Sequence, residues 1–179
     1  MLLTELKADL SAWLAEYAPD AKVRSLADVI AFNEAHRDRE LRWFGQEHFL
    51  RAQAKGGLDS KEYLEALANN RRYSRAEGLD QVLAEHKLDA LVAPSATPAF
   101  LTDFIRGDNS GGGFSSPAAV AGYPHLTVPA GYVFGLPVGI SFVGAAWSEG
   151  TLLQLGYAFE QSSRARRAPT FPRSVSVGG

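Results

Sequence analysis

The sequence predicts an α/β fold, with a helical first half followed by a mixed β-sheet packed with helices and a C-terminal helix. Apolar residues recur at spacings of three and four over much of 1–87, which is the period of a helix. Short apolar runs bounded by Pro and Gly predict strands near 89–93, 126–128 and 138–143. The chain after Ser148 returns to the helical spacing.

The first helices have recognisable ends. One helix is predicted over 3–17 and stops at Pro19, because proline cannot continue a helix. Ser25 is expected to cap a second, shorter helix, since its hydroxyl can accept a bond from a free backbone N–H. A third helix is expected to run through 41–51 and to end at Gly56-Gly57.

A long helical segment completes the first half. It is expected to begin after Asp59 or Ser60, either of which can cap it, and to run to about Lys87. Gly78 lies inside this segment and is expected to mark a bend or a break.

The second half is punctuated by turns. Pro94 ends the apolar run 89–93, and residues 94–114 are rich in Pro, Gly, Ser, Asp and Asn, which predicts a loop. A loop this long is usually functional or disordered. Ser116-Pro117 is expected to open a short helix, because proline suits the first helical turn.

The last elements are a hairpin and a helix. The run 138–143 alternates apolar and small residues with period two, as a strand does. We expect it to pair with 126–128 across the turn at Gly135-Leu136-Pro137. Ser148 is expected to cap the C-terminal helix.

The composition excludes several classes of protein. The chain has 179 residues and a net charge of −2, so it lacks the basic surface that nucleic-acid binding requires. It has no cysteine, which excludes disulfides, thiol nucleophiles and cysteine metal sites. No apolar run approaches the roughly 20 residues of a membrane span, and no targeting segment is recognisable. We expect a soluble, cytoplasmic protein that binds neither nucleic acid nor membrane.

The chain fits a single domain or part of a larger one. We expect one partial domain over 1–163, with a helical part, 1–87, and a part that contributes to the sheet, 88–163. Residues 164–179 carry four arginines followed by Pro, Ser and Gly, and are expected to form a disordered basic tail.

Three blocks of the second half resemble amidase-signature proteins. They are DALVAPSATP at 89–98, SPAAVAGYP at 116–124 with LTVPAG after it, and GLPVGI at 135–140 with YAFE further on. Their order and spacing are similar to the C-terminal third of that family, and the helical half resembles the region before it. The family includes peptide amidases and the catalytic subunits of glutamyl-tRNA amidotransferases.

The resemblance implies a fold and a chemistry. Family members are mixed sheets covered by helices on both faces, and they hydrolyse amide C–N bonds without a cofactor. A serine attacks the carbonyl, and a second serine, held by a cis peptide, relays its proton to a lysine. The nucleophile lies in a Gly/Ser-rich loop whose backbone amides stabilise the oxyanion. A serine hydroxyl needs a positioned base to take its proton. The negative charge that develops on the carbonyl oxygen needs fixed hydrogen-bond donors.

One stretch imitates the catalytic loop of that family. SGGGFSSPAAVAG at 110–122 contains glycines, paired serines and an alanine-rich helix. Pro117 follows the serines where the family has a pair of glycines, so we reject the match and assign no catalytic residue. Activity of the chain alone through Ser115 or Ser116 stays open as an alternative.

Other catalytic sets are poorly supported. A catalytic lysine must be desolvated to lose its proton near neutral pH, and every lysine here lies in a polar helical or turn segment. The histidines show no helical zinc spacing, so no metal site is expected. Ser115, His125 and Asp108 could form a triad, but short loops offer such coincidences freely.

The resemblance also indicates which residues line a substrate cleft. The family places the loop after the first strand, and the turn before the short helix, near its substrate. An acidic residue expected of tRNA-dependent amidotransferases is replaced by Gly112, which puts glutamine recognition in doubt. The candidate substrate-binding residues are Ser95, Thr97, Phe100, Asn109, Phe114 and Ser115.

Two functional hypotheses follow. The first is that the chain is the C-terminal part of an amidase, inactive alone, which forms fold and cleft for a small amide or a peptide amide. It predicts self-association or pairing with a missing N-terminal half, because strands would lack neighbours. The second is a non-catalytic binding or interaction module on an amidase-derived scaffold, which would be a stable monomer with its own ligand.

Overall fold

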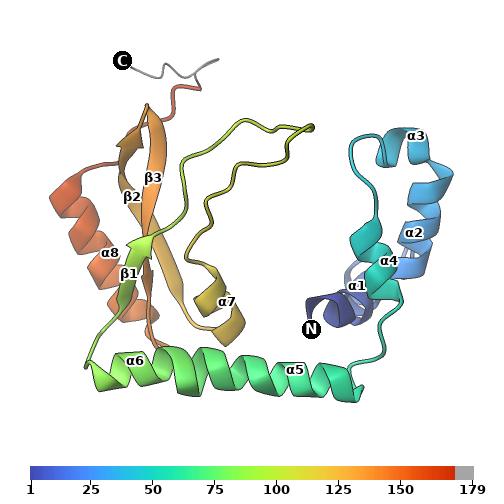
Figure 1. The fold of residues 1–179 in the computed structure, drawn as a ribbon, viewed down its shortest axis with the longest axis horizontal. Coiled ribbons are helices and arrows are strands. Elements are labelled where there is room, and N and C mark those ends of the chain that lie inside the picture. The colour runs from blue at the N-terminus through green and yellow to red at the C-terminus, as the bar shows by residue number, and fades with distance from the viewer. Residues whose placement is uncertain (172–179) are drawn as a thin grey trace. The chain divides into compact units, whose positions relative to one another are not determined.

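The computed structural model describes residues 1–171 (Figure 1). The chain divides into two compact units, Met1–Asn69 and the part from Asn70 onward. The first unit is helical, and the second contains a three-stranded sheet with helices packed on it. The predicted α/β architecture is confirmed.

The first unit is built from helices of the predicted order. Ser25 caps the second of them as expected, since its hydroxyl accepts a bond of 3.2 Å from the backbone N–H of Asp28. The side chains of Leu14, Leu26 and Ala52 are buried between the helices. These helices are α1 (Leu2–Tyr17), α2 (Leu26–Ala35), α3 (Arg37–Glu40), α4 (Glu47–Gln53) and α5 (Lys61–Arg71), the last of which continues into the second unit.

A single helix through 41–51 was the wrong prediction. The chain leaves helical geometry after Glu40 and re-enters it at Glu47. Gln46 explains the break, because its side-chain amide donates to the carbonyl of Ile30 and accepts from Asn33, both at 3.3 Å on α2. This tertiary contact fixes the turn and outweighs the helical spacing.

Lys7 closes the other end of α4. Its ammonium donates to the backbone carbonyls of Gln53 and Lys55, at 3.0 and 2.9 Å. The last backbone carbonyls of a helix have no N–H partner within the helix, so they need a donor from elsewhere. The helix therefore stops at Gln53, three residues before the glycine pair that was expected to end it.

The long helical segment bends at Gly78 as predicted. It comprises α5, a π-helical stretch η1 (Arg72–Leu79) and α6 (Asp80–Glu85). Glu77 and Gly78 leave helical geometry, with Gly78 at φ −132° and ψ −110°. A Cβ atom at Gly78 would overlap the carbonyl oxygen of Tyr73, so the bend depends on glycine at this position.

The sheet is antiparallel, with the strand order β1-β3-β2. Its hairpin turns through Phe134 and Gly135, which both have positive φ, as a tight turn of this length requires. The strands begin or end up to five residues away from the predicted limits, and β2 continues past Pro129 through a register shift. The strands are β1 (Leu91–Pro94), β2 (His125–Val133) and β3 (Leu136–Val143).

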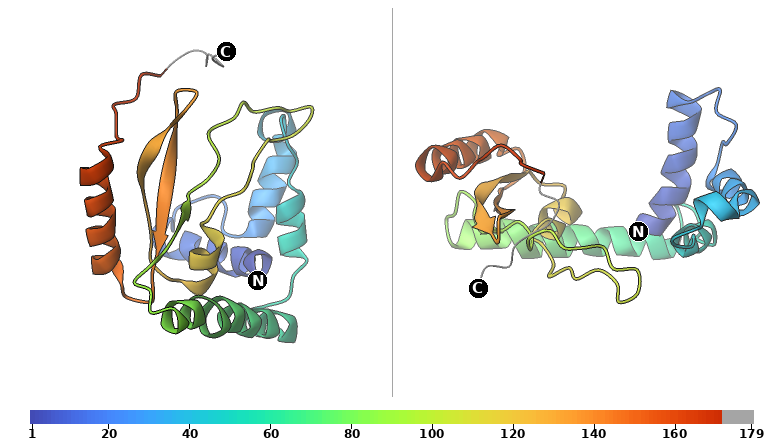
Figure 2. Two further views of the ribbon diagram at one scale, coloured as in Figure 1. Left: turned by 60° about the vertical axis from the view of Figure 1, so that its left-hand side comes forward. Right: turned by 90° about the horizontal axis from the view of Figure 1, so that it is seen from above.

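Helices cover both faces of the sheet near its Val143 end. On one face, α8 (Glu149–Ser163) runs along the hairpin and buries Leu152 against Val128 and Phe142 (Figure 2). On the other face, α7 (Ser116–Ala121) packs on Val143, which points opposite to Phe142 because side chains alternate along a strand. The predicted hairpin, short helix and last helix are thus confirmed.

The C-terminal part differs from the expectations in one respect. Ser148 occupies the N-cap position of α8, but its hydroxyl donates to the carbonyl of Ala145 at 2.8 Å instead of capping the helix. Residues 165–171 form no helix or strand, and the backbone N–H of Arg167 donates to the hydroxyl of Tyr132 at 3.1 Å. The remainder of the predicted tail, 172–179, lies outside the described residues.

Tyr123 joins α7 to the bent helical segment. Its hydroxyl donates to the carboxylate of Asp80, with distances of 2.8 and 2.9 Å to the two oxygens. Arg75 donates to the carbonyl of Ala121 at 2.7 Å and lies 5.6 Å from the centre of the Tyr123 ring. Burial, and then the bond to Asp80, raise the pKa of Tyr123 above its usual value.

We expect Tyr123→Phe to lower the free energy of unfolding by about 1 kcal/mol, because it removes a hydrogen bond to a charged group. Since the folded-state pKa of Tyr123 is raised, its contribution is complete below the unfolded tyrosine pKa of about 10. It is lost as the pH rises through the higher folded value. Chemical denaturation at neutral and alkaline pH measures both effects.

The control for that experiment is Tyr157→Phe, which changes an exposed tyrosine on α8. It should leave the stability and its alkaline dependence as in the unaltered chain. A Tyr123→Phe protein with an unchanged free energy of unfolding would show that the bond to Asp80 does not stabilise the fold.

Candidate functional site

The loop after β1 is closed at its base by a short set of backbone bonds, which we call the neck. Ser95 donates from its N–H to the carbonyl of Gly139 on β3 at 2.9 Å, and its own carbonyl accepts from Phe114 at 3.0 Å. Ala96 and Gly113 form an antiparallel bridge next to this bond. The two ends of a long loop are therefore held side by side at the end of the sheet.

Three hydroxyls form a ring beside the neck. The hydroxyl of Ser141 donates to Ser95 at 2.7 Å, Ser95 donates to Thr127 at 3.4 Å, and Thr127 lies 3.0 Å from Ser141. Ser141 is fully buried, and the strand register places Thr127 directly opposite it. Gly139 permits this approach, because a Cβ atom there would lie 2.8 Å from Ser95 Oγ.

The ring is a structural contact between strands. Each hydroxyl can donate once and accept once within it, so its polar groups are satisfied in a partly buried position. Within residues 1–171, no basic side chain hydrogen-bonds to any of the three. A serine hydroxyl is a weak nucleophile until a positioned base takes its proton.

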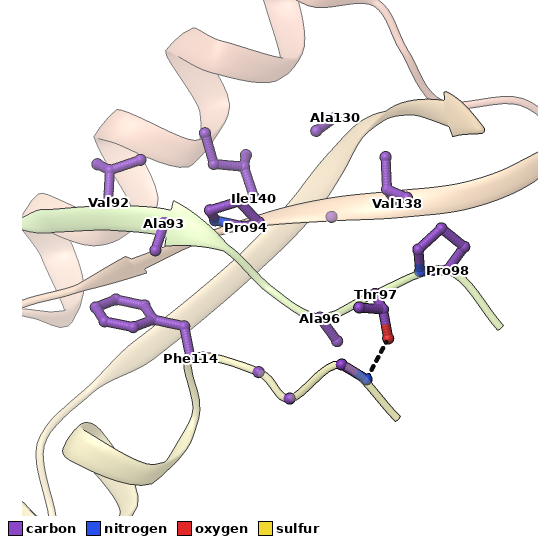
Figure 3. A pocket seen from close by; sticks show the side chains of 14 residues that line it. Val92, Ala93, Pro94, Ala96, Thr97, Pro98, Phe114, Ala130, Val138 and Ile140 are labelled. Carbon is purple, nitrogen blue, oxygen red and sulfur yellow. Dashed lines mark hydrogen bonds between the residues drawn. The ribbon is translucent and has the colours of Figure 1, made fainter. Parts of the chain in front are cut away.

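A hollow of about 760 Å³ lies at the neck (Figure 3). We call it the neck hollow. Residues of β1, β3 and both ends of the loop contribute to its walls, and within residues 1–171 Thr97 supplies its only polar side chain. Its lining residues are Val92, Ala93, Pro94, Ala96, Thr97, Pro98, Gly111, Gly112, Gly113, Phe114, Ala130, Val138, Gly139 and Ile140.

The predicted substrate-binding residues fall into three places. Thr97 and Phe114 line the neck hollow, and Ser95 lies beside it over Gly139. Phe100 and Asn109 line a different hollow of about 520 Å³ in the outer part of the loop. The structure brings the first three residues together and separates the other two from them.

Ser115 lies in none of these hollows. It occupies the N-cap position of α7, where its carbonyl accepts a bond from Ala119. Ser115 and Ser116 are both exposed. The paired serines therefore start a helix of small residues, which agrees with Pro117 at its first turn.

Residues of the sheet complete the neck hollow, and no motif of the sequence marks them. Val92, Val138 and Ile140 line it from runs that were predicted only to form strands. The available signal was the period-two pattern of 138–143, which gives the faces of a strand but not its neighbours.

The outer part of the loop contains a turn that is held by hydrogen bonds to a side chain. The carboxylate of Asp103 accepts bonds of 2.9 Å from the backbone N–H groups of Ile105 and Arg106. These bonds, that of Arg106 first, lower the pKa of Asp103. Leu101 and Ile105 are over nine-tenths exposed on this turn.

The described chain contains neither a candidate metal site nor a candidate membrane span. Among residues 1–171, no three His, Asp or Glu side chains lie close enough together to hold a metal ion. In the same part of the chain, no helix combines the length and the apolar character that crossing a membrane requires.

Comparison with known proteins decides the family. The family model described as Amidase matches residues 2–153. The chain belongs to the amidase family.

Curated relatives support this assignment along the chain. A protein of Arabidopsis thaliana described as "Probable amidase" is 41% identical over 172 residues, which is 95% of this amidase chain and 30% of the relative. A glutamyl-tRNA(Gln) amidotransferase chain of Desulforudis audaxviator is 41% identical over 99 residues, 50% of this chain and 20% of the relative.

Solved structures give the same result. The peptide amidase in complex with the competitive inhibitor chymostatin is 49% identical, with a TM-score of 0.90, over 95% of this chain and 34% of its own. The native peptide amidase of Stenotrophomonas maltophilia is 50% identical, with a TM-score of 0.86 and the same shares. This amidase chain thus spans about a third of the length of these two peptide amidases and a fifth to a third of the curated relatives above.

Proposed function

We propose that this chain is the C-terminal part of an amidase that hydrolyses a linear amide, and that it is inactive alone. In this proposal the neck, with Ser95, Thr97 and Phe114, belongs to the substrate cleft. Phe100, Asn109 and Ser115 are the outer candidates for contact with the substrate. The nucleophile, its relay serine and the lysine belong to the part of the domain that this chain does not contain.

One observation carries the proposal: the chain matches only 34% of the length of a peptide amidase at 49% identity. The hydroxyl ring supports it, because no basic side chain of the described residues hydrogen-bonds to it. Two lysines of the first unit support it too. Lys7 donates to backbone carbonyls, and Lys55 pairs with Glu62 at 2.6 Å, so both ammonium groups already have structural partners.

A chimera tests the activity. The matching third of the Stenotrophomonas maltophilia peptide amidase is replaced by this chain, and release of ammonia from a peptide amide is measured. We expect the chimera to hydrolyse the amide and the isolated chain to give no ammonia above the blank. A folded chimera without activity would contradict the proposal.

The isolated chain has its own decisive variants, Ser115→Ala and Ser116→Ala. If the unaltered chain releases ammonia and either variant does not, the chain is an enzyme by itself and the proposal is wrong. Hydrolysis by a pair of exposed serines would require a base positioned to take the proton of the hydroxyl.

Partners are part of the same proposal. We infer self-association of the isolated chain or pairing with an N-terminal amidase half, because β1 and β2 are the outer strands of the described sheet. Light scattering at increasing concentration tests it, and a stable monomer would favour the alternative of an independent binding module. The cytoplasmic location predicted from the sequence is tested by cell fractionation.

A further inference from the structure

We propose that the neck hollow binds an uncharged, apolar side chain of the amide substrate. This inference rests on the proposed function, because it names the substrate class that the cleft would accept. It concerns binding only and can be tested without catalysis.

The lining of the neck hollow supplies the first argument. Its walls are aliphatic and aromatic, from Val92 and Pro94 of β1, Val138 and Ile140 of β3, and the ring of Phe114 (Figure 3). Among the described residues that line it, none is ionisable. A carboxylate or ammonium that entered would lose hydration without gaining an opposite charge, whereas an apolar group would gain by leaving water.

The polar groups at the neck supply the second argument. Thr97 Oγ1 accepts the N–H of Gly111 at 3.4 Å, so the one polar side chain of the lining already takes part in closing the loop. The charged residues of the loop 94–114 are Asp103, Arg106 and Asp108, and all three line the separate outer hollow. The neck hollow therefore offers contact area and shape, and no ionic anchor.

The size of the hollow agrees with this occupant. Ligand pockets usually have volumes of about 300–1,000 Å³, and the neck hollow has about 760 Å³. That volume holds a leucine or phenylalanine side chain together with the adjoining amide. The neck keeps the hollow in shape, because backbone bonds on both sides of Ser95 fix the loop ends against β3.

Two small amides of nearly equal size form the test. The two probes are N-acetyl-leucinamide and the α-amide of N-acetyl-aspartic acid. Their side chains have a similar branched shape, but that of leucine is neutral and that of aspartate is negatively charged. Saturation-transfer NMR on the whole chain at neutral pH measures binding even if the chain associates. We expect the leucyl probe to bind about tenfold more tightly, with the strongest transfer to its methyl groups.

Matched variants locate the binding. Val138→Lys and Val92→Lys each place an ammonium in the lining, and each should weaken the leucyl probe and strengthen the aspartyl probe. Val92 is 53% exposed, so it tolerates a charge if the change at Val138 disturbs folding. Val133→Lys is the control on the same hairpin, because Val133 is exposed and does not line the hollow.

Equal binding of the two probes, or none of the leucyl probe, would overturn the proposal. The neck hollow would then be a surface that packs against the rest of the amidase domain. Unchanged selectivity in both lysine variants would also overturn it. If the chimera is active but the chain binds both probes equally, this inference alone is rejected. If the chimera is inactive but the chain prefers the leucyl probe, the proposed function alone is rejected.

Discussion

Leu152→Ala is expected to lower the free energy of unfolding by about 3 kcal/mol. Leu152 is 2% exposed and packs against Val128 and Phe142, where α8 covers the sheet. Removing its branched end deletes buried apolar area and leaves a cavity that the strands cannot fill. Chemical denaturation followed by circular dichroism measures the change.

The neighbouring residue provides the control. Leu153 lies in the same helix and is 61% exposed, so Leu153→Ala makes the same chemical change with the same effect on helix propensity. We expect it to shift the stability by no more than about 0.5 kcal/mol. Equal losses for the two variants would mean that α8 does not pack on the sheet through the face that contains Leu152.

Gly78→Ala is expected to lower the free energy of unfolding by about 2 kcal/mol, although alanine has a higher helix propensity than glycine. A Cβ atom at this position would overlap the carbonyl oxygen of Tyr73, and this atom belongs to the backbone and cannot rotate away. The bend would have to open, which moves η1 relative to α6. Thermal and chemical unfolding of the variant measure the cost.

Gly150→Ala is the matched substitution. A Cβ atom at Gly150 has open space around it, in the first turn of α8. The variant should be as stable as the unaltered chain or up to about 1 kcal/mol more stable. If both glycine variants gained stability, the bend at Gly78 would not be a requirement of the fold.

The helices and the hairpin could be predicted because local patterns determine them. Ser25, Pro19 and the spacing of leucines mark ends and faces without help from the rest of the chain. The break at 41–46 could not, since it depends on bonds from Gln46 to residues of α2. Local spacing carries no information about such a partner.

The predicted end of the second strand was wrong for a related reason. Pro129 predicted its end, because proline cannot donate to a central ladder. In the structure β2 is an outer strand, where the missing donor costs little, and the chain passes a register shift before it continues to Val133. Only the order of the strands reveals that this position is tolerated.

The candidate site was predicted in part. The resemblance indicated Thr97 and Phe114, and both line the neck hollow. It did not indicate Val138 or Val92, because their proximity follows from the pairing of β1 with β3 and not from any motif. Phe100 and Asn109 were grouped with them by position in one loop, and the closed neck places them in another hollow.

The strand order also determines how the sheet can assemble. β1 is made first, yet its sole neighbour in the described sheet is β3, whose Val143 pairs with Leu91 across 52 positions of sequence. β2 and β3 are joined by a turn of two residues and can meet at once, since a short loop loses little entropy on closing. On the ribosome, the first strand must therefore wait for a hairpin that does not yet exist.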